Sequence, residues 1–307
     1  MSEALFEILN DQNLGARTGI PREFCERLEL VLAAPGEGAD HAICEITIRL
    51  RWLFYLDPNW VKSRLIPWFS IEAHEAPPAW NALLHDNQLW PVELFTLLKS
   101  SFLRVFEVFT DWHWDDQPVS RLHEFLVLAC YWHKKSGKYV DYAEARLALQ
   151  RSNDDGRSHA IWFLSSIIAD ENVWNSFGKP FVLKAWPKEA RCQTEASSRQ
   201  LATIAEASGE NFPDVVRTIG SLLVPSAQLD VFVYNTNEQE KGDDESRAKL
   251  PRKFPNAMLT LLDRLVPDDP SRAPYGLGPL INIIVEADAG LRQDSRWRRL
   301  NRIVHAQ

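Results

Sequence analysis

Apolar side chains recur at helical spacing in two stretches near the C-terminal end of the chain, which begin at Phe212 and Phe254. In the first, FPDVVRTIGSLLVP, the apolar positions follow the i, i+3, i+4, i+7 order of one helix face. The second, FPNAMLTLLDRLVP, repeats this order, with an aromatic-Pro pair in front and Val-Pro behind. Proline in a first turn costs no hydrogen bond, and the later proline ends the helix. Each stretch is therefore predicted to be one helix.

A weaker third copy precedes these two, because Trp174 and Pro187 keep the separation of the first aromatic and last proline. Its interior contains Gly178 and Pro180, which both disfavour a continuous helix. We therefore expect this helix to start late.

Another apolar helical pattern comes before two of these stretches, at 159–170 and 198–209, and each ends in a short polar turn. The segment 77–109 has the same organisation, with a turn at HDNQ and a second helix opened by Trp90-Pro91. Paired helices with a period of about 40 residues are typical of HEAT and armadillo arrays. The pattern predicts an all-α protein, an irregular α-solenoid of stacked, HEAT-like helical hairpins. A non-repeating helical bundle is the alternative.

This reading divides the chain into an N-terminal helical cap over 1–70 and a helical-hairpin array over 71–307, although one continuous domain is also compatible with it. Helices are predicted at 21–34 and 40–56, separated by a glycine-containing turn. A further short helix has Asp57 as its N-cap.

Three later segments are assigned from local signals. A long helix is predicted to start at Ser120 as its N-cap and to stop at Gly137. The segment LDVFVYN, 229–235, is the best strand candidate, although Ser226 could equally cap a helix there. The polar segment 236–253 is predicted to be a mobile surface loop.

Composition excludes several classes of protein. With 45% hydrophobic and 25% charged residues among 307, the chain is ordinary for a globular protein. A net charge of -8 disfavours non-specific nucleic-acid binding, because the surface has no overall attraction for phosphates. The four cysteines are widely spaced, which is typical of reduced thiols in a cytosolic protein.

Nothing in the sequence indicates export or membrane insertion. The N-terminus, MSEALFEILNDQN, carries acids where a signal peptide has basic residues. The longest apolar run, 125–132, is far shorter than the roughly 20 residues that a membrane-spanning helix needs. A cytoplasmic location is predicted.

The densest cluster of polar and aromatic residues is DWHWDDQP, followed by a histidine one helical turn later. Carboxylates and imidazoles that converge can bind a metal or act as acid and base. A metal-dependent hydrolase is therefore one functional alternative, but an acidic loop with packed tryptophans explains the same residues. The residues concerned are Asp111, His113, Asp115, Asp116 and His123.

No cofactor is expected. The two G-x-G segments, 34–42 and 274–283, lack the preceding strand and the third glycine of a dinucleotide-binding fingerprint. We also find no nucleophile elbow and no cysteine beside a histidine, so no catalytic residue is assigned.

The C-terminal segment LRQDSRWRRLNRIVHAQ is basic and contains one tryptophan. Such residues can contact phosphates, stack on bases or bind a partner, which makes nucleic-acid binding here a further alternative. A basic last helix can equally close the end of a helical array. The candidate contacts are Arg296, Trp297, Arg298, Arg299 and Arg302.

The stretch LFYLDPNWVKSRLIPWF has a helix start at Asp57-Pro58-x-Trp60 and a stop at Pro67-Trp68-Phe69. The stretch APPAWNALLHDNQLWPVELFTLLKSSFL follows, in which Trp80 leads to a Leu-Lys-x-x-Phe-Leu ending at Phe102-Leu103. This region, about 50–110, resembles the tryptophan-rich helical C-terminal region of bacterial sirtuin-type, NAD-consuming anti-phage defence proteins. The resemblance implies a sensing or scaffolding helical part, and no sirtuin-like nucleotide-binding sequence accompanies it.

These observations together favour a non-catalytic protein-interaction, scaffold or sensor module. Its expected partner is a protein, either an effector subunit or a phage component, because stacked helices present extended binding surfaces. The resemblance leaves open whether the chain is a truncated product, a separate subunit or an excised domain.

Overall fold

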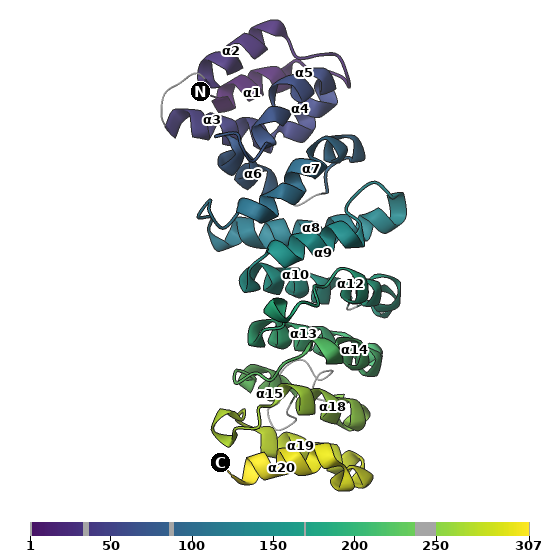
Figure 1. Cartoon of the computed structure of the whole chain (residues 1–307). Helices are drawn as coiled ribbons and strands as arrows, with labels where there is room; N and C mark the ends of the chain where they lie inside the picture. The colour runs from purple at the N-terminus through teal and green to yellow at the C-terminus, as the bar shows by residue number, and fades with distance from the viewer. Residues whose placement is uncertain (1, 33–36, 86–88, 169, 237–249, 307) are drawn as a thin grey trace. The chain divides into compact units, whose positions relative to one another are not determined.

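The computed structural model describes residues 2–32, 37–85, 89–168, 170–236 and 250–306, and within these ranges its regular structure is helical, without a strand (Figure 1). The predicted all-α class is confirmed. Contacts group the chain into two compact units, Met1–Glu144 (unit 1) and Ala145–Gln307 (unit 2). The domain organisation predicted from the sequence places its boundary elsewhere, after residue 70, and stays a prediction.

Unit 1 consists of the following helices and one 3-10 turn: α1 (Ser2–Asp11), α2 (Arg22–Leu32), α3 (Glu37–Ile48), α4 (Leu50–Leu56), α5 (Pro58–Arg64), η1 (Ile66–Phe69), α6 (Ala76–Leu84), α7 (Val92–Val108) and α8 (Asp116–Ser136). Helix α9 (Tyr142–Arg151) begins in unit 1 and continues into unit 2.

An aromatic core holds α6, α7 and α8 together. The rings of Trp90 and Phe125 stack with centroids 4.1 Å apart, and Phe102 packs edge-on against both rings. Trp80 is fully buried and donates its indole N–H to the carbonyl of Phe69 at 3.1 Å. Two tryptophans of the resemblance region, Trp80 and Trp90, therefore belong to the core of this unit.

Helix termini in unit 1 follow local chemistry. The Asp57 side chain accepts a hydrogen bond from the Trp60 amide at 2.9 Å, which confirms the predicted N-cap. Gly137 adopts φ 68° at the end of α8, where a left-handed residue closes a helix. The predicted start of this helix is wrong, because α8 begins at Asp116, and Ser120 lies inside it. The predicted helix 40–56 is also divided, at Arg49, into α3 and α4.

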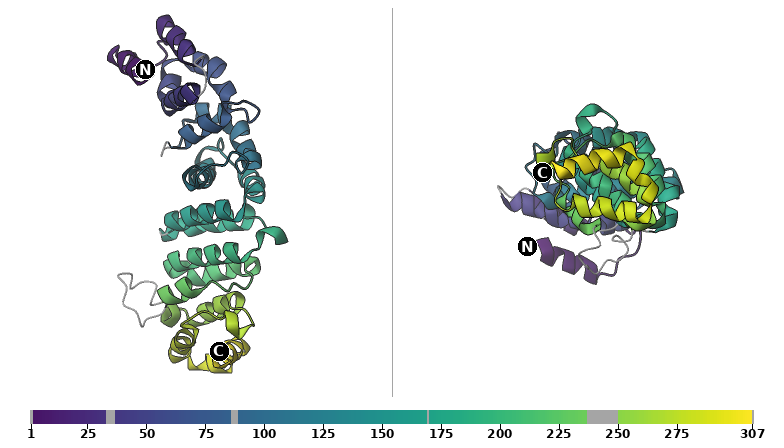
Figure 2. Two further views of the ribbon diagram at one scale, coloured as in Figure 1. Left: turned by 90° about the vertical axis from the view of Figure 1, so that its left-hand side faces the viewer. Right: turned by 90° about the horizontal axis from the view of Figure 1, so that it is seen from below.

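Unit 2 contains these elements after α9: α10 (Asp154–Ile167), α11 (Glu171–Val173), the π-helical turn η2 (Trp174–Gly178), α12 (Lys179–Lys184), η3 (Ala190–Cys192), α13 (Glu195–Ala207), η4 (Gly209–Asn211), α14 (Phe212–Ile219), η5 (Gly220–Leu222), α15 (Asp230–Thr236), α17 (Leu250–Lys253), α18 (Pro255–Leu265), η6 (Pro270–Arg272), α19 (Leu277–Ala287), η7 (Ala289–Gln293) and α20 (Ser295–His305). Helix α13 packs on α10, α14 packs on α18, and α18 packs on α19 and α20. Within unit 2 the helices follow one another in chain order, as Figure 1 and the left-hand view of Figure 2 show.

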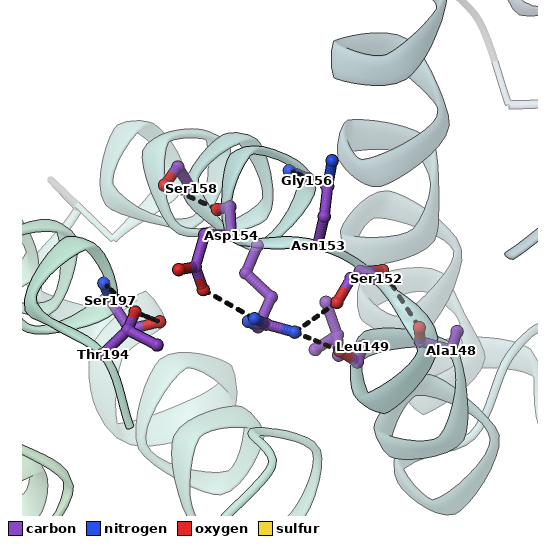
Figure 3. Close-up of polar contacts among 10 residues, drawn as sticks. Ala148, Leu149, Ser152, Asn153, Asp154, Gly156, Ser158, Thr194 and Ser197 are labelled. Carbon is purple, nitrogen blue, oxygen red and sulfur yellow. Dashed lines mark hydrogen bonds and ion pairs between the residues drawn. The ribbon is translucent and has the colours of Figure 1, made fainter. Parts of the chain in front are cut away.

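The junction between α9 and α10 is fastened by one buried arginine. Arg157 donates to the carbonyls of Leu149 and Ser152, at the end of α9, and to the Asp154 carboxylate at 2.6 Å (Figure 3). Asn153 caps α10 by accepting from the amide of Gly156 at 2.9 Å. Carbonyls at a helix end lack partners within the helix, so this arrangement satisfies them and fixes the turn.

Equivalent residues of the repeated stretches contact each other. The rings of Phe212 and Phe254, which open the two copies, stack with centroids 6.0 Å apart and an interplanar angle of 18°. Trp174, the first residue of the weaker copy, donates its indole N–H to Asp214 at 2.9 Å. The opening residues of the three stretches therefore each contact the neighbouring stretch.

The expectation that the third copy starts its helix late is wrong. Helical turns run from Glu171 to Lys184, and the π-helical turn at Trp174–Gly178 accommodates Pro180, which has no amide hydrogen to donate. Gly178 is required in this turn, because a Cβ there would lie 2.7 Å from the ring of Trp174.

The strand candidate at 229–235 is wrong as well, since Asp230–Thr236 forms α15. Ser226 does not cap this helix; its hydroxyl accepts from the amide of Gln228 at 3.3 Å. Of the predicted mobile loop at 236–253, residues 237–249 lie outside the described residues, while its two ends belong to α15 and α17.

Candidate functional site

The residues of the predicted metal-dependent hydrolase are not brought together. Asp111, His113 and Asp115 are exposed on the connection between α7 and α8, and Asp116, the first residue of α8, is exposed as well. Across the described ranges, no group of three His, Cys, Asp or Glu side chains is arranged to hold a metal ion. The acidic-loop interpretation fits better, because Trp112 and Trp114 pack edge-on with centroids 5.0 Å apart.

His123 lies apart from those four residues, in the core of unit 1. It is 0% exposed, its Nδ1 donates to the carbonyl of Val119 at 2.7 Å, and its ring packs edge-on against Phe106 and Phe109. Nδ1 must carry the proton in this hydrogen bond, because the carbonyl can only accept. His123 therefore serves packing within the aromatic core.

The C-terminal arginines divide into two groups. Arg296 pairs with Asp294 at 2.6 Å, and Arg299 pairs with Asp263 at 2.9 Å and with Asp268 at 2.6 Å. These two arginines are therefore paired with carboxylates within unit 2.

The other candidate contacts of this helix differ in exposure. Arg298 and Arg302 are exposed, and Trp297 is half-buried. Phosphate or partner contact by this helix stays a prediction that rests mainly on Arg298 and Arg302.

The cysteines fit the expectation of packed thiols. Cys25, Cys44, Cys130 and Cys192 are all free, and the last two are buried. Burial, assisted by the negative charges of nearby Asp141 and Glu144, strongly raises the pKa of Cys130. This thiol stays protonated at neutral pH and is a poor nucleophile.

A groove of about 640 Å³ in unit 1 is the strongest candidate for a binding site. Helices α1, α3, α4 and α6 enclose it, together with the residue between α3 and α4. Its size falls within the range of small-molecule sites, which are mostly apolar with a few polar groups. The apolar lining consists of Phe6, Ile48, Trp52, Ala82 and Leu83, and the polar lining of Glu7, Asn10, Thr47, Arg49, Arg51 and His85.

Arg49 is held in place at the edge of this groove. Its Nη1 donates to the carbonyl of Glu45 at 2.9 Å and to the Glu45 carboxylate at 2.6 Å. The guanidinium carbon also lies 4.5 Å above the centre of the Phe6 ring, a cation–π contact. The break between α3 and α4 occurs at Arg49, so the same local irregularity that divides the helix places this side chain on the groove.

Unit 2 exposes large apolar side chains. Trp162 on α10 is 57% exposed, Val231 on α15 is 74% exposed and Tyr275 before α19 is 90% exposed. The Tyr275 amide donates to Asp230 at 2.8 Å, which brings Tyr275 close to the start of α15 and to Val231.

The sequence analysis predicted neither the groove of unit 1 nor the exposed apolar side chains of unit 2. The groove residues come from three distant segments, 6–10, 47–52 and 82–85, and only their packing brings them together. The one local signal was the basic and aromatic run ITIRLRW within the predicted helix 40–56.

Comparison of the chain with protein-family models, with curated proteins and with solved structures gives no match. Among the described helices, none combines the length and the apolar character required to cross a lipid bilayer.

Proposed function

We propose that the protein is a non-catalytic interaction module in which unit 2 is an irregular, HEAT-like array of helical hairpins that binds a protein partner. The stacking of Phe212 on Phe254 carries this proposal, because equivalent residues of two sequence copies meet across neighbouring helices. Such contact between successive copies is the defining feature of repeat arrays. Further cross-links between neighbouring copies support it, including the ion pair of Lys179 with Asp214 at 2.9 Å.

The exposed apolar side chains of unit 2 indicate where a partner would bind. Tyrosine and tryptophan dominate the energetics of protein interfaces, and exposed apolar side chains that lie together mark such surfaces. Tyr275 and Val231 form the most exposed pair of this kind in the described part of unit 2. The resemblance of residues 50–110 suggests an effector subunit or a phage component as the partner in a bacterial defence system.

The test is co-purification from the native host, with and without phage challenge, of tagged wild-type protein and of the double variant Val231→Ala/Tyr275→Ala. We expect a stoichiometric partner with wild type and its loss with the variant. The matched control is Leu30→Ala/Tyr55→Ala, which removes an exposed aliphatic and an exposed tyrosine from unit 1. A partner that both variants retain equally, or metal-dependent hydrolysis by the purified chain, would contradict the proposal.

A further inference from the structure

The groove of unit 1 presents hydrogen-bond donors that the described part of the chain does not use. Arg49 bonds Glu45 through Nη1 alone, so Nε and Nη2 have no hydrogen-bond acceptor there. The indole N–H of Trp52 and the side-chain amide of Asn10 likewise lack a partner among the described residues. The Arg49 side chain is 28% exposed, so solvent or a ligand can reach it.

The orientation of Arg49 suits an oxyanion. Guanidinium is planar and offers pairs of parallel donors that match the two oxygens of a carboxylate. Because Glu45 and the Phe6 ring already fix this side chain, little conformational entropy remains to be lost when a ligand binds. The lining contains a second arginine, Arg51, and one carboxylate, Glu7, while Glu45 already pairs with Arg49.

The rest of the groove suits a flat apolar body. Three residues of the apolar lining, Phe6, Ala82 and Leu83, are buried, and we call them the floor of the groove. The rest of the apolar lining is Ile48, which is 56% exposed, and Trp52, which is half-buried. An exposed isoleucine beside an aromatic ring gains free energy when a ligand removes both from water.

From this combination we infer that the groove binds a small amphipathic anion, namely a carboxylate carried on a flat apolar ring system. Arg49 holds the carboxylate, Trp52 and Asn10 donate further hydrogen bonds, and the ring lies on the apolar floor. This site is independent of the partner surface of unit 2, so either proposal can fail without the other.

The test uses naphthoate and its uncharged isostere naphthamide, with the fluorescence of anilinonaphthalene sulfonate as the reporter for displacement. We expect naphthoate to displace the dye from one site per chain and naphthamide to bind at least about tenfold more weakly, because it lacks the charge-assisted pairing with Arg49. Equal affinities for the two compounds would overturn the proposal.

The variant Arg49→Gln should weaken naphthoate binding about tenfold and leave naphthamide binding within about twofold. Its control is Arg22→Gln, which removes another arginine that pairs with a glutamate one helical turn away, but on the outer surface of α2. This control should bind both compounds as wild type does. An equal loss in both variants, or none in Arg49→Gln, would show that Arg49 does not hold the anion.

Circular dichroism of each variant verifies the fold. If Arg49→Gln does not fold, Trp52→Phe decides, since it keeps an aromatic ring at this position and removes the indole donor, together with part of the ring area that both compounds would contact. We expect it to weaken naphthoate several-fold while naphthamide binding changes less. Unchanged naphthoate binding in Trp52→Phe would then reject the inferred site.

Discussion

Thr47 contributes an unpaired polar atom to the wall of the groove. The residue is 1% exposed, and its Oγ1 is buried without a hydrogen-bond partner in the described part of the chain. Burying a hydroxyl without a partner costs free energy, whereas a methyl group of the same shape has no such cost. The threonine at this position is therefore explained by neither packing nor internal hydrogen bonding.

Replacing this hydroxyl should stabilise the free protein. We expect Thr47→Val to raise the free energy of unfolding by about 1 kcal/mol in denaturant titration. Thr96→Val is the control, because the Thr96 hydroxyl is exposed and donates to the carbonyl of Val92 at 2.7 Å. That control should give no comparable gain. A loss of stability in Thr47→Val would indicate that the hydroxyl has a stabilising role.

At the scale of the element, the π-helical turn at Trp174–Gly178 depends on one glycine. A Cβ on Gly178 would lie 2.7 Å from Cε3 of Trp174 and 2.8 Å from Cγ2 of Ile168. Both side chains are fully buried, and Trp174 is also bound to Asp214, so neither can easily move. Overpacking of this kind destabilises a core.

We expect Gly178→Ala to lower the free energy of unfolding by about 2 kcal/mol. The control is Gly220→Ala: Gly220 has φ -53° in a helical turn, and a Cβ there would have nothing within 4 Å. Alanine at that site should be neutral or slightly stabilising, because it restricts the unfolded chain. Thermal unfolding followed by circular dichroism compares the two, and equal melting temperatures would show that the turn can repack.

Most helices could be predicted because period, capping residue and proline agree, as they do at Asp57 and in the stretches that begin at Phe212 and Phe254. Prediction failed where tertiary packing overrode local preference. The β-branched and aromatic run at 229–235 favours a strand, yet it forms α15, with Leu229 and Val233 fully buried. The π-helical turn was not predicted either, because Gly178 and Pro180 favoured a late helix start, and no local pattern indicates that Trp174 donates to a distant aspartate, Asp214.

The candidate sites were less predictable than the helices. The residue types in DWHWDDQP predicted metal ligands, but a metal site also requires the side chains to converge, and His123 is buried in the core. The groove required knowledge of how α1 and α6 pack beside Arg49, which no local pattern contains. Sequence alone therefore describes the helices well and the surfaces between them poorly.

At the scale of the whole molecule, carboxylates hold unit 2 together across successive helices. Asp214 accepts hydrogen bonds from Trp174 and Lys179. Partial burial is the largest single influence on the pKa of Asp214 and raises it, because burial favours the protonated form. The two hydrogen bonds and the positive charge of Lys179 together outweigh burial, so the pKa lies below its ordinary value. The amide of Ala227 and the guanidinium of Arg272 lower the pKa of Glu195. For Asp294, the hydrogen bond from Arg296 lowers the pKa to about 2.

These lowered pKa values make unit 2 sensitive to acid. An aspartate has a pKa of about 3.9 in an unfolded chain, so a group whose pKa is lower when folded stabilises the protein above that pH. This contribution is lost as the pH falls through the folded value, which for Asp294 means between roughly pH 4 and pH 2. Stability should therefore be highest near neutral pH and decline below about pH 4.5, as the glutamate contribution is lost first.

Asp294→Asn isolates one of these contributions. The amide can still cap α20 through its oxygen, but it cannot form the ion pair with Arg296. We expect the variant to be less stable than wild type by about 1 kcal/mol at pH 7, a value reduced for solvent screening, and the difference to vanish towards pH 2. Urea unfolding at pH 7, 4, 3 and 2 measures this difference in the free energy of unfolding.

The control is Asp111→Asn, because Asp111 is exposed and its side chain forms no ion pair in the described structure. The control should follow the wild-type curve, and a constant difference between Asp294→Asn and wild type at all pH values would mean that the ion pair does not contribute to the acid sensitivity of unit 2.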